Sequence, residues 1–159
     1  MGPYHRLRYL ISTRSPTLTF TMHRFVYRVS GGRLFHTSGG KMPVLLLTTM
    51  GRKSGQPRTW PLNYLRDGAD LVLVASNCGR DYHAAWYLNL LAQPNASAQI
   101  GGKRIPVTAR VASPEERARL WPTLKKLEPL YAAYEAGITD RKSTRLNSVT
   151  DQSRMPSSA

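Results

Sequence analysis

The sequence predicts a mainly β fold of the α+β class, in which an antiparallel sheet closes on itself and short helices cover its ends. Five strand-like segments follow one another, most of them through short turns. Helical segments stand between the third and fourth strands and after the fifth. The chain has no G-x-G-x-x-G motif and no regular alternation of strands and helices, which argues against a parallel dinucleotide-binding sheet.

The first elements are read from apolar runs. Residues 23–30 suggest a short basic helix. Residues 43–49 (PVLLLTT) form a continuous apolar run typical of a buried strand, and residues 59–65 form the returning strand. Asp67-Gly68 is a tight hairpin signal, so residues 71–76 (LVLVAS) are expected to form the third strand.

The remaining elements follow the same logic. Residues 83–93 predict a short helix that Pro94 ends, and residues 96–100 and 104–111 predict two strands joined at Gly101-Gly102.

A further helix is expected to begin after Ser113, with Pro114 at its first position and Glu116 closing a capping box. Pro129 ends that helix, and a second short helix follows it.

The net charge of +14 lies mainly in the first part of the chain, since no acidic residue precedes Asp67. This field favours an anionic small molecule, nucleic acid or an anionic membrane, and charge alone does not choose among them. No apolar run is long enough to cross a membrane. The single cysteine, Cys78, excludes an internal disulfide and a cysteine-rich metal site, and no metal site is predicted.

We expect one folded domain at residues 22–141. Residues 1–21 lack helical periodicity and precede a second methionine, so we interpret them as a disordered leader or a mis-assigned start. Residues 142–159 are polar and are expected to be disordered and non-native.

The turn between the first two strands carries the strongest functional signal. It reads GRKSGQPR and holds Arg52, Lys53 and Arg58 among glycines and hydroxyl groups. Glycine allows close approach of backbone amides, and guanidinium groups grip carboxylate or phosphate. The turn therefore predicts a site for a ligand with several negative charges; the alternative is a solvated basic turn.

Two further segments fit a flat heteroaromatic ring. Residues 74–77 end a strand and expose backbone amides, while residues 86–89 place aromatic surface and an amide on a helix. Trp86 is also a candidate for the core, and Asn89 between two leucines needs partners from backbone or ligand. No nucleophile elbow or carboxylate pair is present, so an enzyme of this composition would need its cofactor to supply reactivity.

The segments HRFVYRVSGG, GRKSGQPRTWPLNYL, DLVLVAS, WYLNLLAQP and YAAYEAGITDR resemble the deazaflavin-dependent nitroreductase family over residues 23–141. The resemblance implies a split β-barrel related to flavin-binding pyridoxamine-phosphate-oxidase barrels. It also implies binding of coenzyme F-420, an 8-hydroxy-5-deazaflavin with a polyglutamate tail.

The resemblance assigns site residues by position. The phosphate and glutamate tail would meet Arg52, Lys53, Ser54 and Arg58. The ring would be flanked by Thr59, Trp60, Pro61, Val74, Ala75, Ser76 and Asn77. The site would be closed by Ala85, Trp86, Tyr87 and Asn89. Catalytic or acceptor-orienting roles fall to Ser76, Tyr131 and Tyr134.

The sequence departs from the family at several positions. Asn63 stands where some members have an aromatic residue, Glu128 where one class has tyrosine, and Cys78 where glycine is usual. The family continues after Arg141 into an apolar strand that we expect to be missing here.

We therefore predict an oxidoreductase that transfers a hydride from reduced deazaflavin to a small electrophile: a quinone, nitroaromatic or enoate. The alternatives are a carrier barrel with little turnover and a barrel that binds flavin mononucleotide. A nucleic-acid-binding barrel, which the positive charge also suggests, leaves the WYLNL segment unexplained and is not favoured. We expect a cytoplasmic protein, either monomer or homodimer, with weak association with membrane surfaces.

Overall fold

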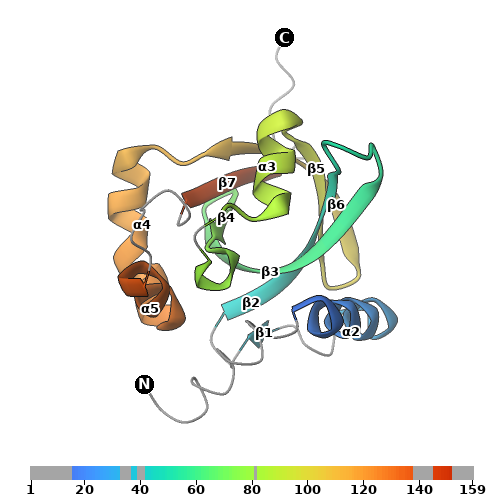
Figure 1. Cartoon of the computed structure of the whole chain (residues 1–159), viewed down its shortest axis with the longest axis horizontal. Coiled ribbons are helices and arrows are strands. Elements are labelled where there is room, and N and C mark those ends of the chain that lie inside the picture. The colour runs from blue at the N-terminus through green and yellow to red at the C-terminus, as the bar shows by residue number, and fades with distance from the viewer. Residues whose placement is uncertain (1–15, 33–36, 39–41, 81, 138–144, 152–159) are drawn as a thin grey trace.

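The computed structural model describes residues 16–32, 37–38, 42–80, 82–137 and 145–151 (Figure 1). Its strands form one antiparallel sheet in the order β1-β2-β3-β4-β7-β6-β5. A further pairing of β2 with β5 closes β2 to β7 into a ring. The strands are β1 (Thr37–Ser38), β2 (Met42–Met50), β3 (Pro57–Asp67), β4 (Asp70–Ala75), β5 (Asn95–Ile100), β6 (Lys103–Val111) and β7 (Arg145–Asp151). The predicted sheet that closes on itself is confirmed.

Helices surround the ring. They are α2 (Pro16–Val29), the short 3-10 helix η1 (Asn77–Gly79), α3 (Ala85–Ala92), α4 (Pro114–Leu127) and α5 (Leu130–Gly137). Figure 1 shows α3 across the open end of the ring, α4 and α5 together on one side, and α2 on another. The predicted capping box of α4 is present: Glu116 N–H donates to Ser113 Oγ (3.2 Å), and Ser113 N–H donates to Glu116 Oε2 (2.8 Å).

Both faces of the central strands are buried, which explains their continuous apolar runs. Leu45 and Leu47 of β2 belong to the cluster inside the ring, together with residues of α3. The alternate residues Val44 and Leu46 pack outside the ring on Tyr27 of α2. Strand β4 has the same alternation, because its outward residues pack under α4 and α5.

The structure differs from the predicted domain limits at both ends. Helix α2 begins at Pro16, so residues 16–21, which we interpreted as part of a disordered leader or a mis-assigned start, are helical. Residues 145–151 form β7 between β4 and β6, where we had expected disorder. A ladder is made by backbone groups, so a polar segment can complete it. Residues 1–15, 138–144 and 152–159 lie outside the described residues.

Candidate functional site

The turn between β2 and β3 is tightly folded. The N–H groups of Ser54 and Gly55 both donate to Gly51 O, at 3.1 and 2.7 Å. Gly55 has a φ of 64°, a conformation that favours glycine. A Cβ on Gly51 would lie 2.7 Å from Ser54 Oγ. Gly55 is therefore required by the turn itself, whereas a side chain on Gly51 would force the Ser54 hydroxyl to move; Arg52, Lys53 and Ser54 lie exposed in this turn.

Asn89 connects this turn to α3. Its Oδ1 accepts hydrogen bonds from Arg52 N (3.1 Å) and the Arg52 guanidinium (3.5 Å), and its Nδ2 donates to Thr49 Oγ1 (3.1 Å). Asn89 and Thr49 are both buried. The buried amide that the sequence singled out thus has protein partners, and it fixes the turn against the helix that covers the ring.

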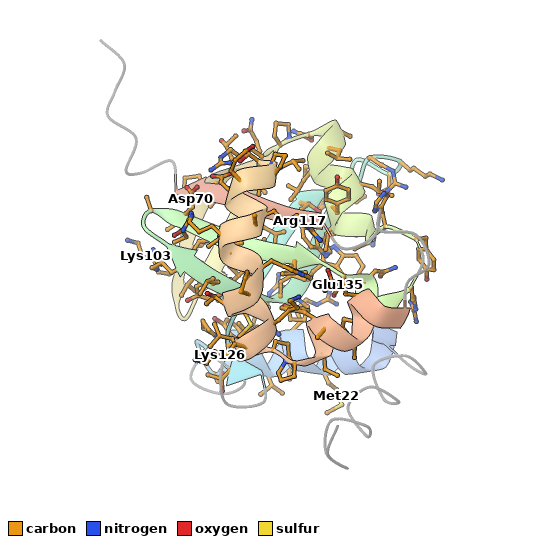
Figure 2. All side chains as sticks on the ribbon, turned by 90° about the vertical axis from the view of Figure 1, so that its left-hand side faces the viewer. Met22, Asp70, Lys103, Arg117, Lys126 and Glu135 are labelled. Carbon is orange, nitrogen blue, oxygen red and sulfur yellow. The ribbon has the colours of Figure 1, made fainter. Side chains whose placement is uncertain are left out.

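The charges of the turn have no counter-ion within the described part of the chain. Arg52, Lys53 and Arg58 are exposed and take part in no ion pair there. On the α4 side, shown in Figure 2, three basic side chains form ion pairs with carboxylates. The pairs are Arg110 with Asp70 (3.0 Å) and Glu116 (2.6 Å), Arg119 with Asp67 (2.6 Å) and Lys125 with Glu135 (3.2 Å). The turn is therefore a concentration of uncompensated positive charge.

Two arginines near this turn were missed by sequence reasoning. Arg24 donates to Thr59 O (3.3 Å), and Arg28 donates to Thr59 Oγ1 (3.1 Å), which is also 2.9 Å from Thr48 Oγ1. Their spacing of four residues places them on one face of α2. That spacing was visible in the sequence, but the packing of α2 against β3 was not.

The second half of the site lies where β4 ends. Ser76 is buried and is followed by Asn77 and Cys78, which have positive φ values of 46° and 58°. Asn77 Nδ2 donates to Tyr82 O (2.9 Å). A Cβ on Gly79 would lie 2.6 Å from Tyr134 Cδ1, so η1 packs closely on α5. The structure thus brings the segment after Ser76 next to the helix that carries Tyr131 and Tyr134.

Tyr131 lies deeper than expected for a residue that borders a pocket. Its ring stacks on Trp121 (centroids 6.1 Å apart), and its side chain is hydrogen-bonded to Asn63. Burial raises the pKa of Tyr131 well above its usual value, and the charge of Glu128 raises it further. Its hydroxyl therefore stays protonated at physiological pH.

The other ring-flanking candidates are spread over several environments. Trp86, Tyr87 and Ala75 belong to the cluster inside the ring, and Val74 belongs to the cluster under α4 and α5. The alternative interpretation of Trp86 as a core residue is therefore borne out by its burial. Pro61 is partly buried on β3, Ser54 is exposed in the turn, and Ala85 is exposed at the start of α3.

Trp60 is partly buried on β3, and its indole nitrogen is buried without a hydrogen-bond partner among the described residues. A buried donor of this kind is uncommon, and a bound molecule could satisfy it. Among the residues predicted to flank the ring, Trp60 is thus the one whose buried N–H group lacks a hydrogen-bond acceptor in the described part of the chain.

The closed ring and its covering helices define a split barrel. A pyridoxamine 5'-phosphate oxidase-like protein of Listeria innocua shares this fold, with a TM-score of 0.50 at 15% identity over 69% of this chain and 83% of that chain. That likeness concerns the fold alone.

A profile of the F420H(2)-dependent quinone reductase family matches residues 19–146, and the chain belongs to this family. An F420H(2)-dependent quinone reductase of Mycobacterium tuberculosis is 43% identical over 102 residues, covering 63% of this chain and 68% of that protein. The structure of the F420-H2-dependent reductase FDR-A matches with a TM-score of 0.60 and 35% identity, over 67% of this chain and 93% of that chain. The predictions of a deazaflavin-dependent oxidoreductase and of coenzyme F420 as its cofactor are confirmed.

Proposed function

We propose that this protein transfers a hydride from reduced F420 to a small quinone, with the cofactor's acidic tail on the turn between β2 and β3. The observation that carries the placement is the exposed group Arg52, Lys53 and Arg58, which has no counter-ion in the described part of the chain. A tail of phosphate and carboxylates supplies the missing negative charge. Ser54 adds a hydroxyl donor in the same turn.

The residues present also suit the ring of the cofactor. The indole N–H of Trp60, which has no partner among the described residues, offers a donor on the strand that leaves the turn. Thr59, Pro61 and the segment from Val74 to Asn77 supply backbone from neighbouring strands. On the helix side, Ala85 is exposed, while Trp86, Tyr87 and Asn89 form the wall from within the core.

When bound, the reduced cofactor supplies the hydride, so the chain needs no nucleophile or metal of its own. The acceptor gains the hydride and one proton, which balance the two hydrogens lost from the reduced cofactor. Tyr131 keeps its proton at physiological pH and so acts as a hydrogen-bond donor rather than as a base. We assign to Ser76, Tyr131 and Tyr134 the role of orienting the acceptor, and to Ser76 that of helping to deliver its proton.

A quinone is favoured over nitroaromatic and enoate acceptors because the family is defined by quinone reduction. Nitroaromatic and enoate compounds remain predictions for a wider acceptor panel. The oligomeric state, monomer or homodimer, also remains a prediction.

The test is a fluorescence titration with oxidised F420 on the full chain and on Lys53→Ala and Arg58→Ala. Each loss of an exposed charge-assisted contact should weaken binding by roughly tenfold, and more at low salt. Lys126→Ala removes an exposed charge from α4 and should bind normally. Equal affinity of all four proteins would reject the placement of the tail. Quinone reduction by F420H2 is followed in parallel.

We further propose a cytoplasmic protein that associates weakly with anionic membrane surfaces through α2. Met22, Phe25 and Val29 share one face of this helix and are 62%, 67% and 72% exposed. Met22 projects away from the barrel in Figure 2. No helix within the described residues is long and apolar enough to span a bilayer. An exposed apolar face on a basic helix is typical of interfacial binding.

Sedimentation with vesicles measures this association. Phosphatidylglycerol vesicles should retain the protein, phosphatidylcholine vesicles should retain less, and Phe25→Ser should reduce both. Equal retention on both kinds of vesicle, unchanged by Phe25→Ser, would contradict the proposed association through α2.

A further inference from the structure

Two arginines of α2 meet at a single residue of β3. Arg24 Nη1 donates to Thr59 O (3.3 Å), and Arg28 Nη2 donates to Thr59 Oγ1 (3.1 Å). The same hydroxyl lies 2.9 Å from Thr48 Oγ1 on β2. A guanidinium group carries five N–H donors, so each arginine keeps donors that Thr59 does not use. Two positive charges with spare donors are therefore held at one place on the barrel.

No carboxylate balances these two charges within the described part of the chain. The ion pairs found there involve Arg110, Arg119 and Lys125 instead. Hydrogen bonds alone would fasten a helix to a strand, and neutral side chains can supply them. Two guanidinium groups at one threonine repel each other, and an anion bound to both removes that repulsion. The arrangement therefore favours an anionic ligand over a purely structural contact.

The two arginines lie at the same end of β3 as the cationic turn, because Thr59 directly follows Arg58. Residues 57–63 of β3 pair with β2, whereas pairing with β4 begins only at Tyr64. The other edge of residues 57–63 thus has no strand beside it in the part of the chain that the structure describes. A flexible acidic chain that starts at the turn can follow this edge of β3 towards α2.

The packing of α2 orients the arginines in advance. Tyr27 lies on the same side of the helix and packs on Val44 and Leu46, and its hydroxyl donates to Val44 O (3.1 Å). The hydrogen bonds to Thr59 already restrict the two arginine side chains. Side chains that are ordered before binding lose less conformational entropy when a ligand arrives.

Resting on the function proposed above, we propose that Arg24 and Arg28 bind the outer carboxylates of the cofactor's glutamate tail and make the protein select F420 with a long tail. The turn holds the phosphate and the first part of the tail, and α2 holds carboxylates that lie further along it. A short tail occupies the turn without reaching α2. Partly exposed charge-assisted contacts contribute a few-fold each, so the two arginines together should contribute about tenfold in affinity.

The experiment is a fluorescence titration with three forms of oxidised F420, which carry the phosphate with no glutamate, one glutamate or six glutamates. The proteins are the full chain, Arg24→Gln, Arg28→Gln, the double variant and Lys126→Gln. Glutamine keeps an N–H donor for Thr59 but removes the charge, so α2 stays attached. Lys126 is exposed on α4, which Figure 1 shows on another side of the barrel, and its variant makes the same change in charge as each single variant.

The readout is the ratio of the Kd for the form without glutamate to the Kd for the form with six. This ratio compares two ligands on one protein, so a partly unfolded preparation does not change it. The double variant should lower the ratio about tenfold, each single variant should lower it a few-fold, and Lys126→Gln should change it less than twofold. An unchanged ratio in the double variant would overturn the proposal. An equal fall in Lys126→Gln and the single variants would also overturn it, because it would show a general charge effect.

A further variant separates this proposal from the proposed function. If Lys53→Ala weakens binding of the cofactor while the ratio is the same with and without Arg24 and Arg28, the tail site on the turn stands and the role of α2 is rejected. If no form of the cofactor binds, the proposed function fails. The α2 site is then judged with a free chain of six γ-linked glutamates, which should slow deuterium exchange of residues 16–29 in the full chain but not in the double variant. No slowing, or equal slowing in both proteins, overturns it.

Discussion

Replacing Asn89 by leucine would test whether one buried amide holds the cationic turn in place. Leucine has the branching of asparagine but a larger volume, so the change removes the hydrogen bonds and adds a packing cost. Thr49 Oγ1, which is buried, loses its donor, and Arg52 N–H loses its acceptor. An unsatisfied buried group costs about 1–3 kcal/mol, and a hydrogen bond at the partly exposed Arg52 about 0.5–1.5 kcal/mol. We therefore expect a loss of roughly 2–4 kcal/mol in the free energy of unfolding.

For a chain of this length, such a loss lowers Tm by roughly 5–15 °C, measurable by calorimetry or urea unfolding. Asn95→Leu is the matched control, because Asn95 is exposed at the start of β5 and should change stability by less than about 0.5 kcal/mol. Asn89→Asp keeps the acceptor for Arg52 and should retain part of the stability. If Asn89→Leu melted with the Asn95 control, the hydrogen bonds of Asn89 would not be what fixes the turn.

Two other predictions concern acid stability and the packing of η1. The hydrogen bond with Arg110 lowers the pKa of Glu116 to about 2, so its contribution to stability is complete above the unfolded value near 4.3 and is lost as pH falls toward 2. Urea midpoints of Glu116→Gln should therefore depend less on pH in that window, and an unaltered pH dependence would count against the pair. Gly79→Ala combines a φ of 79° with a Cβ placed 2.6 Å from Tyr134. It should destabilise by about 1–3 kcal/mol. Gly68→Ala, with a φ of 61° and open space around it, measures backbone strain alone, and equal losses in the two variants would show that Tyr134 does not matter.

The strands could be predicted because local composition decided them. Runs such as PVLLLTT and LVLVAS are mostly apolar since the central residues of each strand are buried on both faces. The start of α4 could be predicted equally well, because its capping box is formed by residues 113–116, which are adjacent in the sequence. These features depend on neighbours in sequence, so no knowledge of the fold was needed.

The rest depended on contacts between distant segments. The extent of α2 was missed because Met22, Phe25 and Val29 are exposed, and among its residues with described side chains only Tyr27 belongs to a core cluster. Strand β7 is polar, and its place is set by the backbone edges of β4 and β6. The turn was identified as an anion site from its composition. The partners of Asn89 lie 37 and 40 residues away, and no local pattern indicated them.

Among the described side chains of helix α2, Tyr27 makes its main buried contact with the barrel. Its buried cluster contains Tyr27 with Val44 and Leu46, and the Tyr27 hydroxyl joins Val44 O (3.1 Å) to Gly101 N–H (2.9 Å). Small clusters open without unfolding of the whole domain. The amides of residues 16–29 should therefore exchange with deuterium far sooner than those of β2. Arg24 and Arg28 of this helix contact Thr59, which lies beside the cationic turn. Binding of an anion in the turn should therefore change the rate at which the amides of α2 exchange.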